Sequence, residues 1–169
     1  MSELDTPDGR GPSNPRLVFE MFARHGVEFV VIGGWAAIGH GSTRNTVDVD
    51  FLAAVEPPNR ARLGAALVEL DARLVGVAAS LVDARMLAEG GNFTLVTRAG
   101  GLDFFNEVPG GAPYDQVRAR SVLADLGDDL QIRIAGIDDL IAMKRAAGRP
   151  QDIRDIATLT HIERERGRP

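Results

Sequence analysis

Two aspartates separated by one residue lie inside an otherwise apolar run, in the stretch VDVDFLA. In an extended strand residues i and i+2 point to the same side, so Asp48 and Asp50 would share one face. Val49 and Phe51 would occupy the opposite face, which their apolar side chains favour burying. Desolvating two neighbouring carboxylates is costly unless positive charges or hydrogen-bond donors meet them. The chain is therefore expected to form a sheet in which a strand over residues 47–54 has one buried side and one acidic side.

The rest of the chain alternates between helix-like and strand-like patterns. We expect helices over residues 15–25, 35–39, 57–72, 81–88, 114–117, 137–147 and 151–166. Further strands are expected over residues 28–32, 93–97, 102–106, 121–126 and 130–134. This alternation predicts an α/β (α+β) fold, with a mixed sheet flanked by helices and a helical segment at the C-terminus. We expect a flexible tail over residues 1–14 and one domain over residues 15–169.

Composition narrows the classes of function. The chain has no cysteine, which excludes thiolate metal sites and cysteine nucleophiles. Its net charge of −5 argues against a surface that binds nucleic acid over its whole area, although residues 142–169 carry more basic than acidic side chains. No apolar run approaches the roughly 20 residues that a membrane helix requires, so we expect a cytoplasmic protein with no membrane contact.

The acidic pair is best explained by a divalent cation. Like charges that close repel each other, and Mg²⁺ typically binds one or two carboxylates together with substrate phosphates. Asp103 lies within the expected strand 102–106 and is a candidate third oxygen ligand. Gly33 and Gly34 follow an apolar strand, where a helix start would offer backbone N–H groups and room for a phosphate to approach. Strand, glycine turn and acidic strand together predict a metal site beside an anion site.

Each of these features also has a purely structural interpretation. The acidic pair could be a solvated strand edge, and the glycine pair an ordinary turn between a strand and a helix. Asp103 could belong to a plain hairpin, and Lys144 could simply complement the negative end of its helix dipole. His40 is more typical of a loop or capping residue than of a general base. Asp138 and Asp139 are expected to cap their helix.

The sequence resembles the nucleotidyltransferases of the DNA polymerase β superfamily. Two segments carry the resemblance, GGWAAIGHGSTRNTVDVD and IDDLIAMKRAAGRPQDIRD. Within that superfamily they are most similar to the AbiEii-like and MenT-like toxins of bacterial toxin–antitoxin systems. The resemblance extends from about Leu17 to His161 and implies the nucleotidyltransferase fold.

The resemblance also implies roles for the acidic residues. It assigns Asp48 and Asp50 to binding Mg²⁺, with Mn²⁺ as the alternative ion, and it places the third acid of the site at Asp103. The superfamily often has serine where this chain has Gly34, so here only the backbone could contact phosphate at that position. The glycine at position 33 matches the first glycine of the family pattern.

Basic residues complete the implied site. By resemblance Lys144 would meet the triphosphate, and Asp152 or Asp155 on the following helix would belong to the site. Arg44 could bind a phosphate from its loop, because a guanidinium group suits that anion well.

The implied reaction is transfer of a nucleoside monophosphate from a nucleoside triphosphate to an acceptor hydroxyl. The toxin resemblance points to RNA, and in particular to the 3′ end of tRNA, as the acceptor, with an antitoxin protein as a further partner. The sequence leaves a small molecule or a protein hydroxyl open as the acceptor. It also leaves open a non-catalytic module that binds nucleotides or partners with the same fold.

Overall fold

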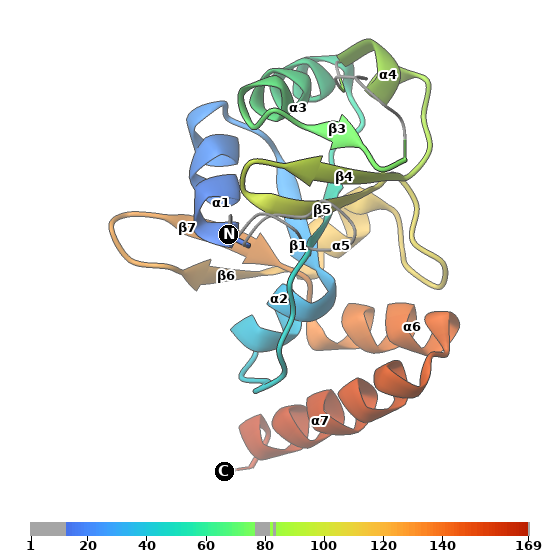
Figure 1. Cartoon of the computed structure of the whole chain (residues 1–169). Helices are drawn as coiled ribbons and strands as arrows, with labels where there is room; N and C mark the ends of the chain where they lie inside the picture. The colour runs from blue at the N-terminus through green and yellow to red at the C-terminus, as the bar shows by residue number, and fades with distance from the viewer. Residues whose placement is uncertain (1–12, 77–81, 83, 169) are drawn as a thin grey trace, which may run out of the picture.

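The fold is a mixed β-sheet with helices around it (Figure 1). The computed structural model describes residues 13–76, 82 and 84–168. Within them the strands are β1 (Phe29–Ile32), β2 (Val49–Ala53), β3 (Arg73–Leu74), β4 (Phe93–Thr97), β5 (Gly100–Phe105), β6 (Val122–Asp125) and β7 (Gln131–Ile134). They form one sheet in the order β3-β4-β5-β2-β1-β7-β6. This arrangement confirms the predicted α/β class and mixed sheet.

The centre of the sheet is built from strands far apart in the sequence. Strand β2 pairs antiparallel with β1 and parallel with β5, while β1 pairs parallel with β7 on its other side. Strands β4 and β5 form the predicted hairpin, and β6 pairs antiparallel with β7 at one edge. Strand β2 is therefore covered by a neighbour on each edge. It begins at Val49, two residues later than expected, so Asp50 lies in the strand and Asp48 immediately precedes it.

Helices lie on both sides of the sheet and at one end of it. They are α1 (Pro15–Arg24), α2 (Gly33–Gly39), α3 (Pro57–Glu69), α4 (Ala84–Ala88), α5 (Tyr114–Arg120), α6 (Ile137–Ala147) and α7 (Pro150–Arg166). In Figure 1 the helix α6 lies to the right of α2 and α7 lies below both, at the end of the molecule opposite α3 and α4. The predicted C-terminal helical segment is thus the α6–α7 pair, in which the two helices pack against each other.

A single hydrophobic cluster holds these elements together. At its centre Phe51 of β2 contacts Phe22 of α1 with ring centroids 5.0 Å apart and Phe104 of β5 at 5.4 Å. Phe51 is fully buried. Because side chains alternate along a strand, burying Phe51 directs Asp50 to the opposite face of the sheet. Packing of the aromatic side therefore fixes the orientation of the carboxylate.

The N-terminal helix begins where its sequence indicates. The Asn14 side chain accepts a hydrogen bond from the Leu17 N–H at 3.2 Å, and Pro15 occupies the first helical position. Asn14 also donates its backbone N–H to the Ala99 carbonyl at 2.8 Å. Residues 1–12 of the expected tail lie outside the described residues, so a flexible tail over residues 1–14 stays a prediction.

Most predicted elements are present, with shifts at their ends. Strand β3 was not expected, since two residues are too few to show a pattern. Helix α3 ends at Glu69, three residues early, because Asp71 adopts a left-handed conformation with φ 54°. Of the expected helix 81–88, residues 84–88 form α4, whereas residues 81 and 83 lie outside the described part.

Two expectations for polar residues are settled by their contacts. His40 is buried, with Nε2 2.8 Å from the Ala135 carbonyl oxygen and Nδ1 3.1 Å from Arg166, and its role is structural. Burial lowers the pKa of this histidine below its usual value. The expectation that Asp138 and Asp139 cap α6 is wrong, because Gly136 is the cap residue and no side chain makes a capping hydrogen bond there. Both aspartates lie in the first turn, and the Asp139 carboxylate accepts hydrogen bonds from Arg120 at 2.6 and 3.0 Å. In the described part of the chain, no helix is long and apolar enough to cross a membrane.

Candidate active site

Three carboxylates meet at the start of β2. Asp50 of β2 lies directly beside Asp103 of the parallel strand β5 in the sheet register, so both side chains leave the same face. Asp48 precedes Asp50 by two residues. All three line one cavity of about 360 Å³, together with Gly33 and Gly34. The three acids that the sequence singles out therefore converge on one site.

The carboxylates of this site repel one another. The pKa of Asp50 is raised from 3.8 to about 7, first by burial and then by the charges of Asp103 and Asp48. A hydrogen bond from the Gly34 backbone and the charge of Lys144 offset part of this increase. Without a cation the site holds more negative charge than its surroundings compensate.

The glycine pair is required by packing at this point. Gly33 begins α2 with φ 63°, and a Cβ there would lie 2.1 Å from an Asp50 carboxylate oxygen. A Cβ on Gly34 would lie 2.4 Å from the Thr46 hydroxyl oxygen. The glycines thus let the acidic strand and its preceding loop lie directly against the start of α2. Their predicted role in binding phosphate stays a prediction, although both line the cavity.

The donor set fits a hard divalent cation in its chemistry. Carboxylate oxygens are the ligands that Mg²⁺ and Mn²⁺ prefer, and the mutual repulsion at Asp50 favours a cation. Among the described residues no three acidic, histidine or cysteine side chains form a ready-made metal site. Mg²⁺ usually completes its shell with water and substrate phosphates, so a bound triphosphate would have to supply part of the coordination.

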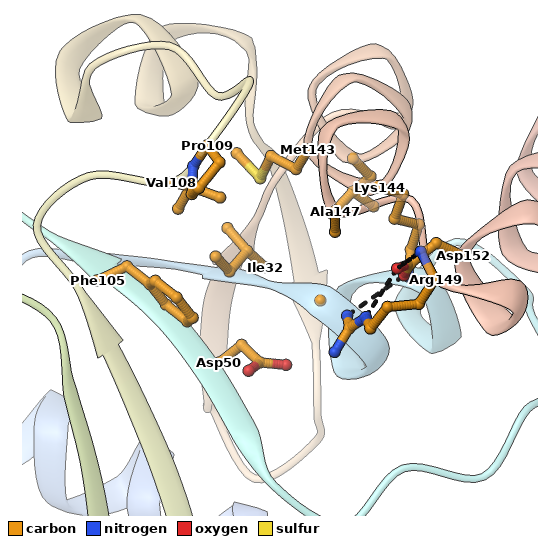
Figure 2. Close-up of a pocket in the computed structure, with 12 residues that line it drawn as sticks. Ile32, Asp50, Phe105, Val108, Pro109, Met143, Lys144, Ala147, Arg149 and Asp152 are labelled. Atoms are coloured by element: carbon orange, nitrogen blue, oxygen red, sulfur yellow. Dashed lines mark hydrogen bonds and ion pairs between the residues drawn. The ribbon is translucent and has the colours of Figure 1, made fainter.

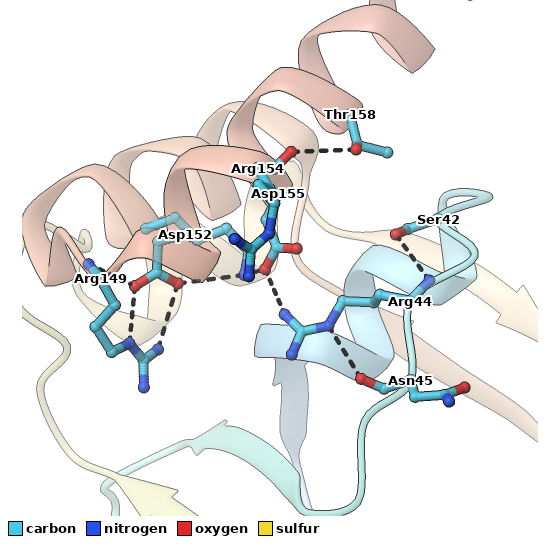
Figure 3. A network of polar contacts seen from close by, with 9 residues as sticks. Ser42, Arg44, Asn45, Arg149, Asp152, Arg154, Asp155 and Thr158 are labelled. Atoms are coloured by element: carbon cyan, nitrogen blue, oxygen red, sulfur yellow. Dashed lines mark hydrogen bonds and ion pairs between the residues drawn. The ribbon is translucent and has the colours of Figure 1, made fainter.

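A network of ion pairs lies on the other side of the cavity, between α6 and α7 (Figure 3). The Lys144 ammonium is 2.5 Å from Asp155 and 3.7 Å from Asp152. Arg44, from the loop before β2, also binds Asp155. Arg149 binds Asp152 with its Nε 2.8 Å from the carboxylate. The predicted basic residues therefore reach the site already bound to the two predicted aspartates of α7.

Lys144 has both a structural and a site-facing position. Its side chain is buried in the α6–α7 contact, yet the residue lines the acidic cavity. The helix-dipole interpretation is incomplete, because carboxylates of the next helix hold the ammonium group. Arg44 likewise lines the acidic cavity.

Arg149 is a site residue that was not predicted. Its side chain is largely exposed and lines the acidic cavity, while Asp152 holds it in place. The sequence RPQD carries a usable signal, because an acidic residue three positions after a helix cap reaches back to that cap. The Asp152 side chain does accept the Arg149 backbone N–H, at 3.1 Å.

A second cavity, of about 330 Å³, adjoins the acidic one and was not predicted (Figure 2). It shares Gly33, Asp50, Lys144 and Arg149 with the acidic cavity. The rest of its lining is mostly apolar and comes from the end of β1, the end of β5 with the loop after it, and α6: Ile32, Phe105, Val108, Pro109, Leu140, Met143 and Ala147. An apolar pocket with a few charged groups at one end is typical of a small-molecule site.

Replacing Asp50 by Asn is expected to stabilise the metal-free protein at pH 8. A carboxyl with a pKa of 3.8 in the unfolded chain and about 7 in the folded protein lowers stability progressively as the pH rises from about 4 to 7, and the loss is complete above pH 7. At one pKa unit per about 1.4 kcal/mol the full cost is at most about 4 kcal/mol, and we expect a gain of about 2 kcal/mol after relaxation.

Urea denaturation in a chelator, at pH 5 and pH 8, checks this expectation. The gain should shrink toward pH 5 and should also shrink when Mg²⁺ is added to the wild type. A variant that is less stable than the wild type at pH 8 would show that the Asp50 carboxylate is well compensated in the folded protein.

Comparison with known proteins identifies the fold. The sequence matches no protein-family model and no curated protein. The lincosamide antibiotic adenylyltransferase LnuA, in its lincomycin-bound structure, matches with a TM-score of 0.60 at 13% identity, over 90% of this chain and 99% of that one. The antibiotic-resistance factor ANT(2'')-Ia matches with 0.56 at 14% identity, over 87% and 80%.

A third similar structure is an antigenic nucleotidyltransferase-like protein from Paracoccidioides brasiliensis, with a TM-score of 0.56 at 16% identity over 89% of this chain and 78% of that one. At such low identities the similarity establishes the architecture and not the reaction. The chain has the nucleotidyltransferase fold, as predicted.

Proposed function

We propose that this protein is a nucleotidyltransferase, which moves a nucleoside monophosphate from a nucleoside triphosphate to an acceptor hydroxyl. The observation that carries the proposal is the pairing of Asp50 with Asp103 on adjacent parallel strands. With Asp48 they line a cavity whose other wall carries Arg44, Lys144 and Arg149. A metal-bound triphosphate carries both positive and negative charges. A cavity with carboxylates on one wall and basic side chains on the other therefore suits it better than a cavity lined by one sign of charge.

The residues have distinct roles in this reaction. Asp48, Asp50 and Asp103 would hold Mg²⁺, or Mn²⁺, which when bound would neutralise charge on the reacting phosphates. Arg44 and Arg149 bind phosphate oxygens, since guanidinium groups match that anion. The acceptor oxygen forms a bond to the α-phosphorus, the bond from that phosphorus to the bridging oxygen of the β-phosphate breaks, and pyrophosphate leaves. The acceptor proton passes to the Asp103 carboxylate.

The apolar cavity gives the nucleoside a place beside the phosphates. It opens from Asp50 and Lys144 toward Phe105 and Met143 (Figure 2). Its volume of about 330 Å³ falls at the lower end of the range for small-molecule pockets. In this arrangement the base packs against apolar side chains and the triphosphate extends into the acidic cavity.

The acceptor we propose first is RNA, with the 3′ end of tRNA as the specific candidate and a toxin role neutralised by an antitoxin protein. This assignment rests on the toxin-like sequence segments. A second candidate is a small antibiotic, because the similar structures include a lincosamide adenylyltransferase and ANT(2'')-Ia in complex with adenylyl-2''-tobramycin. The third is a non-catalytic binding module, which the retention of all three acids disfavours.

A labelling assay tests the reaction and ranks these acceptors. The protein is incubated with Mg²⁺ and each of the four α-³²P-labelled nucleoside triphosphates, with total tRNA, tobramycin or lincomycin as acceptor. We expect label in the tRNA with one preferred nucleotide, and none in a reaction containing the Asp48→Asn, Asp50→Asn double variant. Label in an antibiotic alone would replace the RNA assignment, and the absence of label from every acceptor would favour the binding module.

A further inference from the structure

A polar cavity of about 400 Å³ adjoins the acidic one. It lies between the loop before β2 and the exposed face of α7 (Figure 3). Its lining consists entirely of polar side chains: Ser42, Thr43, Arg44, Asn45, Gln151, Arg154, Asp155 and Thr158. Arg44, Asn45 and Gln151 line both cavities, so the two adjoin each other at these residues. We call this cavity of about 400 Å³ the polar groove.

The charge of the polar groove is positive. Asp155 is the sole acid of its lining, and this buried carboxylate already binds Lys144 and Arg44. Arg154 is exposed, and no acidic side chain in the described part of the chain forms an ion pair with it. The lining of the groove holds two guanidinium groups, those of Arg44 and Arg154, against one carboxylate, that of Asp155, which leaves a net charge of +1.

The remaining side chains are donors suited to phosphate. The Ser42 hydroxyl and the Gln151 amide line the groove, whereas the Thr158 hydroxyl already donates to the Arg154 carbonyl oxygen at 3.1 Å. Such groups make most contacts between proteins and nucleic-acid backbones. The groove offers no apolar wall for a lincosamide, and its positive charge repels a polycationic aminoglycoside.

We propose that the polar groove binds the phosphodiester backbone of a single-stranded nucleic acid and leads its 3′-terminal hydroxyl to the three carboxylates. This inference rests on the proposed function for the direction of the strand, and it places the acceptor on the side of the acidic cavity opposite the apolar one. Arg154 contacts a phosphate upstream of the reacting hydroxyl. Arg44, at the junction of the cavities, contacts the phosphate nearest to it.

The test measures binding without any nucleotide, so it is independent of catalysis. Fluorescence anisotropy follows a fluorescein-labelled 12-nucleotide single-stranded RNA between 50 and 200 mM salt. We expect Arg154→Ala to weaken binding about 5-fold and Arg154→Glu more than 10-fold, because one phosphate contact is lost or reversed. The slope of log affinity against log salt should fall in size by about 0.7 for the alanine variant.

The matched control is Arg85→Ala, which removes the same charge from an exposed position on α4 at the opposite end of the molecule (Figure 1). It should leave affinity and salt slope within 2-fold of the wild type. Equal weakening by the Arg85 and Arg154 variants would show that RNA binding depends only on net charge, and would overturn the proposed role of the polar groove. Unchanged binding by Arg154→Glu, or no RNA binding by the wild type, would also overturn it.

Two further arms separate this inference from the proposed reaction. Asp48→Asn should not weaken RNA binding, because it removes a negative charge from the cavity that the 3′ end approaches, whereas it should lower nucleotide transfer. Loss of RNA binding in Arg154→Glu, in a protein that labels no acceptor, would support the groove and reject the transferase. Label transfer to a small molecule by a protein that does not bind RNA would support the transferase and reject the role of the polar groove. A single-stranded DNA of the same sequence should bind within about 3-fold of the RNA if the backbone alone is read, and binding of neither strand would overturn the groove.

Discussion

Replacing Asp48 by Asn is expected to lower nucleotide transfer by about 100- to 1,000-fold while the fold is kept. The change removes one negative charge from the cavity that Asp48, Asp50 and Asp103 line together, without altering side-chain size. Loss of one preorganised electrostatic group at a reacting phosphate typically has an effect of this magnitude. Initial rates measured over a range of Mg²⁺ concentrations check it, and the variant should require more Mg²⁺ than the wild type.

The control for this prediction is Asp71→Asn. Asp71 is exposed, follows α3 and pairs with Arg73, and its left-handed backbone suits asparagine as well as aspartate. Its rate should equal that of the wild type. If Asp48→Asn also kept the wild-type rate and Mg²⁺ requirement, Asp48 would have no part in the mechanism. The structural interpretation of the acidic pair, as a solvated strand edge, would then hold.

Local patterns were enough to predict the elements around the site. The alternation of side chains in VDVDF indicates which face of β2 is acidic, because burial of Phe51 leaves Asp50 no other direction. The hairpin of β4 and β5 is also local, and it placed Asp103 within a strand. These features depend on residues close in the sequence, so the residue types and the spacing of apolar side chains are enough to predict them.

The order of the central strands could not be obtained in the same way. The pairings of β2 with β5 and of β1 with β7 join segments far apart in the chain. No local pattern indicates which strands become neighbours or in which register. Asp103 was a candidate third ligand from its place in an expected strand, and the family resemblance supported it, but the sheet register is what brings it beside Asp50.

Residues of the site that depend on helix packing were missed or only half understood. The apolar cavity forms where α6 approaches the end of β5 and the residues after it, Val108 and Pro109, and that approach leaves no signal in the sequence. Lys144 was predicted from resemblance, but its burial against Asp155 depends on how α7 folds back onto α6. The sequence therefore identified the charged groups of the site better than the partners that hold them.

Replacing Lys144 by Ala is expected to destabilise the protein by about 3–5 kcal/mol. The ammonium group and the Asp155 carboxylate are both more than nine-tenths buried and lie 2.5 Å apart. Removing one member of a buried pair leaves the other charge poorly compensated, and this accounts for most of the expected loss. Arg44 still binds Asp155, so the loss should fall short of that for an isolated carboxylate. Urea denaturation at pH 7 measures it.

A double-mutant cycle separates the charge effect from lost packing. Lys144→Met retains most of the side-chain volume, and adding Asp155→Asn removes the carboxylate left behind, so the double variant should be more stable than Lys144→Met alone. Arg145→Ala, at the exposed neighbouring position of α6, should change stability by less than about 0.5 kcal/mol. A loss below about 1 kcal/mol for Lys144→Ala would mean that the ion pair contributes little to holding α7. In that case the role of Lys144 would lie with the phosphates of the substrate, and the triphosphate KM rather than the midpoint of unfolding would respond to its removal.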